Sequence, residues 1–172
     1  MTVNSDRRSL HANDLARVQT DLRAAMGNVA AAVAVVTTVD EGGPHGTTVS
    51  AFMSLSLDPP MVAVSLDRAS TLLSKLEVGS PVAVNVLAAH HDQVALRFAT
   101  KSEDTFDGIA WRIEHGAPAL LDRHAGIAGQ VASLIAGGDH VLVLVDVIAA
   151  EASSAPVPLT YWRRTFGTHQ VF

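Results

Sequence analysis

The sequence predicts a mainly β protein, a closed antiparallel barrel with peripheral helices. Short stretches of β-prone residues recur at near-regular intervals, with few helical patterns between them. The hydrophobic fraction is 48% but the aromatic fraction is only 5%. Such a core is filled by many small branched side chains, which favours a sheet over a helix bundle. Closure into a barrel would remove exposed strand edges.

The length of 172 residues fits one domain, which we expect to span residues 1–172. Residues 1–11 are polar and are expected to form a flexible N-terminus. Cysteine is absent, which excludes disulfides, thiolate catalysis and cysteine-based metal or iron–sulfur sites. Redox chemistry would therefore need a cofactor.

Charge and hydropathy limit the classes of partner. The formal net charge is −5 and the twelve Lys and Arg residues are scattered, so no basic face exists for a nucleic acid. The longest apolar stretches, residues 29–39 and 141–150, are too short for a membrane-spanning helix. Arg7 and Arg8 are followed by no apolar region, so neither a signal peptide nor a membrane anchor is expected. We expect a soluble, cytoplasmic protein.

In the first half of the chain, Asn13 can cap a helix that Gly27 ends. One apolar stripe runs along it, formed by Leu15, Val18, Leu22 and Met26. Residues 33–39 then read as a strand, residues 40–46 as a turn, and the hydroxyl-rich segment after it as the return strand of a hairpin.

Further elements follow in order. Strands are predicted at residues 61–66 and 81–87, with a short helix between them at residues 70–77. Residues 90–99 read as a helix whose inward side chains would be Val94, Leu96 and Phe98, and the polar connection after it has Phe106 and Trp111 as anchors. Residues 127–135 and 140–150 are two apolar strands joined by a hairpin turn at residues 136–139.

The hydroxyl-rich segment, residues 47–60, is the most informative stretch of the chain. It carries five hydroxyl side chains among short β-prone residues and ends in Pro59 and Pro60. Small side chains let a backbone approach a ligand closely, and hydroxyl and N–H groups supply directed donors, so the segment can wrap a flat polar ligand. A solvated sheet accounts for the same residues about as well.

Other candidate sites are weaker. The chain has neither a dinucleotide-binding glycine fingerprint nor a phosphate-binding P-loop. Its eight histidines lack metal-ligand spacing, and His90 and His91 read as an exposed helix start, so no metal site is expected.

Three further polar positions have two interpretations each. His140 either simply opens a strand after a Gly-Asp turn or contacts a ligand at the barrel rim. Residues 161–164 are either a solvated edge or a local source of positive charge for a nucleotide phosphate. Asn85 lies in an apolar strand, so its amide needs partners, either the backbone of neighbouring strands or a ligand.

Taken together, these features resemble the flavin reductase-like family, the split-barrel flavin-binding reductase components of two-component monooxygenases. The resemblance is collinear across residues 20–170. The segments that carry it are residues 33–38, 47–60, 82–87, 97–99, 106–109, 116–120, 138–140 and 158–161.

The resemblance implies non-covalent binding of FMN or FAD, hydride transfer from NADH or NADPH, a homodimer, and release of reduced flavin to a partner oxygenase. It places His140 near the nicotinamide as the catalytic residue, and Tyr161 and Arg164 in a C-terminal stretch near the cofactors. The flavin ring would be cupped by Thr47, Thr48, Val49, Ser50, Ala51, Phe52, Met53 and Ser54, with Ala30, Ala31, Ala32, Val33 and Asn85 lining the same pocket.

Two departures from the family pattern stand out. Residues 30–33 read Ala-Ala-Ala-Val where the family often has Pro-Thr-Gly-Val, and residues 131–135 lack the usual cysteine or acidic residue. Two alternatives stay open: a flavin-binding carrier or sensor without nicotinamide turnover, and a haem-binding split barrel with His140 as axial ligand. The choices between FMN and FAD, and between NADH and NADPH, also stay open.

Overall fold

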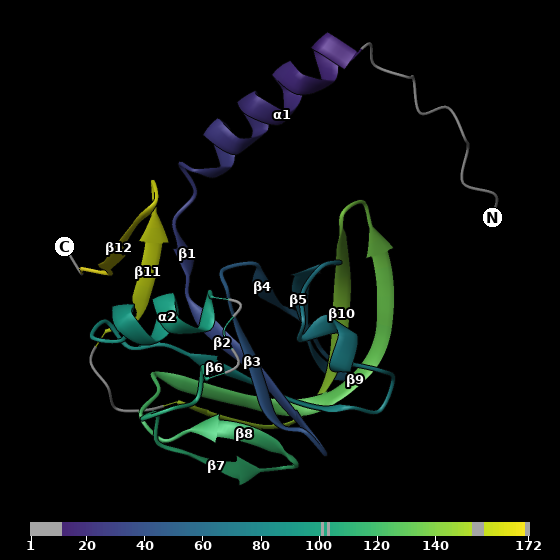
Figure 1. Cartoon of the computed structure of the whole chain (residues 1–172), viewed down its shortest axis with the longest axis vertical. Helices are drawn as coiled ribbons and strands as arrows, with labels where there is room; N and C mark the ends of the chain where they lie inside the picture. Colours follow the sequence, from purple (N-terminus) through teal and green to yellow (C-terminus); the bar gives the residue numbers. More distant parts are fainter. Residues whose placement is uncertain (1–11, 101, 103, 153–156, 171–172) are drawn as a thin grey trace.

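The computed structural model describes residues 12–100, 102, 104–152 and 157–170 (Figure 1). The N-terminal residues 1–11, predicted to be flexible, lie outside the described residues. None of the helices in the described part of the chain is long and apolar enough to cross a membrane.

A seven-stranded antiparallel sheet forms the body of the molecule and confirms the mainly β prediction (Figure 1). Its strand order is β3-β2-β6-β9-β10-β5-β4. The strands are β2 (Ala34–Asp40), β3 (Gly43–Val49), β4 (Phe52–Leu57), β5 (Pro60–Asp67), β6 (Pro81–Val86), β9 (Ala125–Gly137) and β10 (His140–Ala152).

Three hairpins supply half of the neighbouring strand pairs in this sheet, and two of them were predicted. The β2–β3 turn is tighter than the predicted 40–46 turn, since Asp40 already pairs with Gly43. The β9–β10 turn holds only two residues, Gly138 and Asp139, and both strands extend beyond their predicted ends. The third hairpin, β4–β5, turns at the two prolines, where Leu57 pairs with Pro60.

Contrary to the prediction, the sheet is not hydrogen bonded into a fully closed barrel, because its two outer strands do not pair. The hydrogen-bonded order runs from β3 to β4, and these two outer strands are joined by the chain at Ser50 and Ala51 rather than by a ladder. At this corner the carbonyl of Ala51 accepts a hydrogen bond from the Ser65 N–H, 2.9 Å away. The bond pairs the chain at Ala51 with β5, and the sheet has no ladder between β3 and β4.

Smaller elements surround the barrel. A three-stranded sheet combines β1 (Ala31–Ala32), β11 (Leu159–Trp162) and β12 (Thr165–Thr168), and a hairpin combines β7 (Trp111–Glu114) and β8 (Ala117–Leu120). The segment predicted as a helix at residues 70–77 forms only the 3-10 turn η1 (Leu73–Lys75). The helix predicted at 90–99 is α2 (Asp92–Phe98), so His90 and His91 precede it.

The N-terminal helix α1 (Ala12–Met26) stands away from the barrel (Figure 1). It begins one residue before Asn13, the predicted cap. The predicted apolar stripe is present, but all four of its side chains are exposed, and Leu22 and Met26 are exposed by 59% and 57%. This stripe therefore lacks cover from the described part of the chain.

Two apolar clusters meet at β2. Val33 and Val35 pack with Leu87, Leu159 and Phe98 on one side, and the alternate residues of β2 pack inside the barrel on the other. Phe98 was predicted to point inward and is fully buried, whereas Leu96 is half exposed and was wrongly assigned. Ala95 lies one turn before Phe98 and is the inward residue instead, because side chains three apart share a helix face.

Candidate functional site

The segment predicted to hold a flavin ring runs through the open corner of the barrel. Residues 47–49 end β3, residues 50–51 form the corner, and residues 52–54 begin β4. Val49 is buried, and the Thr48 hydroxyl donates to the Ala95 carbonyl of α2 at 2.7 Å. Ser50, Ala51, Met53 and Ser54 are exposed and Phe52 is half-buried, so the accessible part of the predicted cup is the corner and the start of β4.

A groove of about 670 Å³ begins beside this corner, at Thr47. That volume is in the range of pockets that hold drug-sized ligands. Hydroxyl side chains are frequent on its walls: besides Thr47, they are Ser70, Thr71, Thr100, Ser102 and Thr105. Sequence analysis assigned none of these residues to a site, and it placed Ser70 and Thr71 at the start of a predicted helix.

Ion pairs fix one rim of the groove. Lys75 Nζ and His45 Nε2 each lie 2.8 Å from the Asp40 carboxylate. The hydrogen bond from Lys75, and then that from His45, holds the pKa of Asp40 well below its usual range. Asp40 therefore stays ionised and ties the β2–β3 turn to η1 across the groove.

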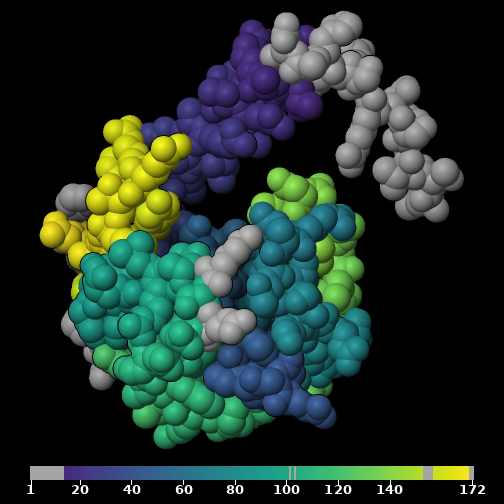
Figure 2. Space-filling model, in the orientation of Figure 1, coloured from purple at the N-terminus to yellow at the C-terminus, as the bar shows by residue number. Residues whose placement is uncertain are grey.

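A wider hollow lies on the same face of the molecule. Figure 2 shows it between the C-terminal hairpin β11–β12 and the tip of the β9–β10 hairpin, with α1 above it. The walls of this hollow come from segments far apart in the sequence.

The stretch Ala30 to Val33 joins the C-terminal hairpin. Ala31 pairs with Tyr161 in the β1–β11 ladder, which brings together two regions that the resemblance places near the cofactors. Val33 is buried, and its N–H and carbonyl bond to Leu159 and Leu87. Ala30 is exposed and Ala32 is half-buried, so only the first part of this stretch is open to a ligand.

The resemblance places Asn85 in the flavin pocket, and in the structure this residue lines a small cavity together with Glu114 and Arg123. Asn85 is fully buried. Its Oδ1 accepts hydrogen bonds from the Leu120 N–H at 2.9 Å and from Arg123 at 3.3 Å. Its Nδ2 donates to the Val35 carbonyl at 3.1 Å. The neighbouring strands and loops thus satisfy this amide, and Asn85 ties β2, β6 and β8 together.

Arg123 is the charged centre of the same buried region. Its Nη2 lies 2.6 Å from a Glu114 carboxylate oxygen and 2.5 Å from one of Glu151. The hydrogen bond from Arg123 lowers the pKa of Glu114. Sequence analysis assigned no role to these residues, because the pairing joins segments that lie 9 and 28 positions apart.

His140 opens β10, as predicted. Its Nδ1 lies 2.8 Å from the Asp139 carboxylate, and this hydrogen bond lowers the pKa of Asp139. The imidazole is 44% exposed. In the ladder His140 pairs with Asp67, which lines the groove. His140 therefore lies beside the groove, and its Nε2 makes no hydrogen bond with a described residue.

The C-terminal segment is anchored to the end of α1. Trp162 Nε1 donates to the Asn28 carbonyl at 3.1 Å. Arg163 donates through Nε and Nη2 to Asn28 Oδ1 at 2.9 and 2.7 Å, and its guanidinium lies 4.5 Å from the centre of the Trp162 ring. Tyr161 and Arg164 are exposed. The hairpin therefore holds a fixed position at the hollow.

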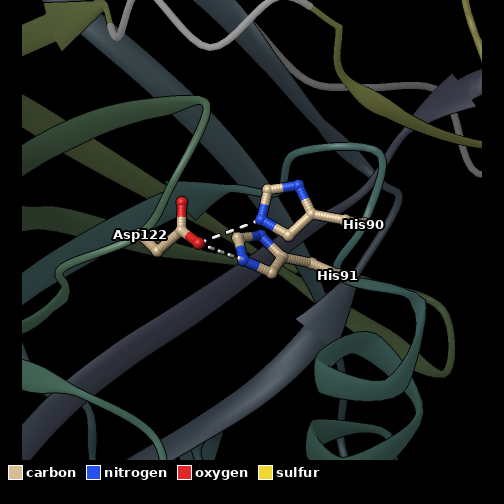
Figure 3. Close-up of side chains that lie close together, drawn as sticks. All are labelled: His90, His91 and Asp122. Carbon is tan, nitrogen blue, oxygen red and sulfur yellow. Dashed lines mark hydrogen bonds and ion pairs between the residues drawn. The ribbon is translucent and has the colours of Figure 1, made fainter.

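Two histidines and a carboxylate converge outside this site (Figure 3). His90 Nε2 and His91 Nε2 lie 2.9 and 3.2 Å from the same oxygen of Asp122. Sequence analysis had no signal for Asp122, which is remote in the chain. The three residues could offer a metal ion three ligand atoms.

The hydrogen bonds of His91 oppose metal binding in this arrangement. His91 Nδ1 accepts the backbone N–H of Ala88 at 3.2 Å. A metal-bound histidine nearly always donates a hydrogen bond from its other nitrogen, whereas here that nitrogen faces a donor. The neutral ring must therefore carry its proton on Nε2, where it donates to Asp122. Desolvation by burial lowers the pKa of His91.

Comparison with known proteins identifies the family. The model of the flavin reductase like domain matches residues 26–170. The chain belongs to this family. Among its relatives, actinorhodin polyketide dimerase of Streptomyces coelicolor is 38% identical over 147 residues, which cover 84% of the chain and 83% of the relative. The flavin reductase (NADH) of Kitasatospora aureofaciens is 36% identical, with 82% and 76% covered.

The fold agrees with this membership. The crystal structure of nitrilotriacetate monooxygenase component B from Mycobacterium thermoresistibile superposes with a TM-score of 0.85 at 31% identity, over 91% of this chain and 89% of that one. The barrel of this flavin reductase-like protein is thus of the split-barrel type. The resemblance stated from the residues alone is confirmed.

Proposed function

We propose that the protein is an NAD(P)H:flavin oxidoreductase that reduces FMN or FAD by hydride transfer and supplies the reduced flavin to a partner monooxygenase. One relative is named a flavin reductase (NADH), and a structural neighbour is named component B of a monooxygenase. The observation that carries the proposal is the accessible stretch of residues 50–54, at the corner and the start of β4, which follows the groove residue Thr47 in the chain.

In this proposal the corner holds the flavin. A bound flavin would accept the hydride and carry the bond-making. Residues 50–54 offer backbone N–H groups and the hydroxyls of Ser50 and Ser54 toward the polar edge of the ring, where negative charge develops on reduction. The hydroxyl groups on the groove walls are suited to the polyol and phosphate parts of FMN or FAD.

The nicotinamide nucleotide would enter from the hollow. Hydride transfer needs the two rings stacked with the reacting atoms about 3–3.5 Å apart. His140 would orient the nicotinamide through its carboxamide, since the transfer requires no proton from the protein. Tyr161 and Arg164 would contact the same nucleotide from the opposite wall.

We also propose that the protein is a homodimer. Four apolar side chains lie exposed along α1, and Met53 and Leu55 on β4 add further exposed apolar surface. A helix with one apolar face is stabilised mainly by packing that face against another surface. A second copy of the chain would supply that surface.

The test is anaerobic stopped-flow absorbance at the oxidised flavin band. Protein loaded with FMN or FAD is mixed with NADH and then with NADPH. Rapid bleaching is the expected result and reveals both preferences. Binding of flavin without bleaching would overturn the reductase function and leave a flavin carrier or sensor.

A further inference from the structure

The turn between β11 and β12 has an unusual backbone for its residues. Trp162 pairs with Thr165, so the loop contains only Arg163 and Arg164. Their φ angles are +48° and +63°. Positive φ at both central positions defines a type I′ turn, which strongly prefers Asn, Asp and Gly because other side chains are strained there. Two arginines occupy this turn at a conformational cost.

The two arginines are used differently. Arg163 is committed to structure, since its guanidinium is held by Asn28 and stacks on Trp162. Arg164 is exposed and makes no hydrogen bond or ion pair with any described residue. Backbone strain at a residue that makes no hydrogen bond or ion pair with the described part of the chain is typical of a functional position.

The surroundings of Arg164 suit a nucleotide. Tyr161 and Trp162 on the same hairpin are exposed aromatic side chains, and Asn28 fixes the position of Trp162. A guanidinium is the side chain best suited to bind a phosphate through two parallel hydrogen bonds. Arg97, by contrast, is engaged within the protein, where it donates to the carbonyl of Asp107.

We infer that Arg164 binds a phosphate group of the nicotinamide nucleotide, and that the anchored β11–β12 turn presents it at the hollow. The inference rests on the proposed function, because it concerns the second substrate of that reaction. Flavin phosphate is a poorer match, since the residues that line the groove at Thr47 come from other segments than this hairpin.

The test replaces Arg164 with asparagine, which removes the charge but tolerates positive φ. The control Arg17→Gln removes another exposed charge, on α1. Binding of NAD⁺ and NADP⁺ to the flavin-loaded protein is followed by tryptophan fluorescence, because Trp162 adjoins Arg164. This readout needs no turnover, so it remains informative if the protein fails to reduce flavin.

We expect Arg164→Asn to weaken nucleotide binding about fivefold or more, while flavin affinity and the control stay unchanged. Loss confined to NADP⁺ would assign the 2′-phosphate, and equal loss for both nucleotides would assign the pyrophosphate. Unchanged binding of both nucleotides would overturn the inference. Weakened flavin binding with unchanged nucleotide binding would overturn it as well, since Arg164 would then serve the flavin.

Discussion

Asn85 and Arg123 are hydrogen bonded within the protein interior, where Arg123 Nη1 donates to Asn85 Oδ1 across 3.3 Å. Both side chains are buried. The contact joins the amide that links β2, β6 and β8 to the guanidinium that links Glu114 and Glu151. Polar side chains thus connect the barrel to the β7–β8 hairpin, and two predictions follow from their chemistry.

Replacing Asn85 with leucine should destabilise the protein without affecting its site. The substitution leaves the buried Leu120 N–H and one Arg123 donor without an acceptor, and we expect a loss of about 2–4 kcal/mol in the free energy of unfolding. Urea unfolding of the flavin-free protein measures it. Unchanged stability together with a tenfold weaker flavin affinity would instead show that Asn85 binds the flavin.

The Glu114 carboxylate should make stability depend on pH. Arg123 lowers its pKa in the folded state below the ordinary value of 4.5. Its contribution is therefore fully present above pH 4.5 and is lost as the pH falls through the lower folded pKa. Glu114→Gln should cost about 1–3 kcal/mol at pH 7, and the difference from the wild type should shrink toward pH 3.

Denaturant unfolding at a series of pH values measures this difference. Glu41→Gln, in the exposed β2–β3 turn, is the matched control and should leave stability unchanged at every pH. A constant difference for Glu114→Gln across the range would contradict the role assigned to its charge.

Gly46 should be intolerant of alanine because it lacks space for a side chain. An added Cβ would lie 2.8 Å from the Phe98 ring, which is fully buried. Moving that ring would shift α2 against the groove, so Gly46→Ala should cost about 1–3 kcal/mol and weaken flavin binding. Thermal unfolding and flavin titration measure both effects. Gly137→Ala meets no atom closer than 3.8 Å and should be neutral.

His140 should affect use of the nicotinamide nucleotide more than folding. Its ring is partly exposed and beside the groove, so His140→Ala should raise the KM for NADH or NADPH about threefold to tenfold with a smaller change in kcat. Steady-state flavin reduction measures both constants. His90→Ala is the control, because that exposed imidazole belongs to the Asp122 cluster. If KM and kcat both stay unchanged, His140 has no role in orienting the nucleotide.

The apolar stripe of α1 should determine the oligomeric state. Leu22→Asp places a charge in the centre of the stripe, and we expect it to convert a dimer into a monomer of 18.0 kDa. Sedimentation equilibrium measures the mass, and circular dichroism checks that the strands persist. Asp21→Asn, next in sequence, should leave the dimer intact. A wild-type monomer at micromolar concentration would refute the proposal.

The sequence predicted the β2–β3 and β9–β10 hairpins and missed the hairpins β4–β5, β7–β8 and β11–β12. The β9–β10 hairpin has long apolar strands and a Gly-Asp turn, so its strand residues and its turn residues both indicate a hairpin. The β7–β8 hairpin has strands of four residues, one of which contains Pro118, and its turn places His115 at φ +49°. Such strands are specified by contacts with β6 and β2, which local pattern does not encode.

The sequence predicted the candidate site only where its residues lie next to one another in the chain. Residues 47–54 form a continuous corner, and His140 directly follows a turn signal. Asn85 had two possible kinds of partner, and its burial against Pro118 and Leu120 arises from tertiary packing alone. The groove hydroxyls at Ser70 and Thr100 come from loops that meet only in the folded chain, so no spacing rule could find them.

The strand order has a consequence for how the chain folds. Hairpins β2–β3, β4–β5 and β9–β10 join neighbours in sequence and can form within microseconds. The sheet is completed by β6 on β2, by β9 on β6 and by β10 on β5, and these pairings close loops of many residues. Contacts of high sequence separation slow folding. The three hairpins should therefore form early, with the docking of the β9–β10 ribbon between β6 and β5 as the rate-limiting step.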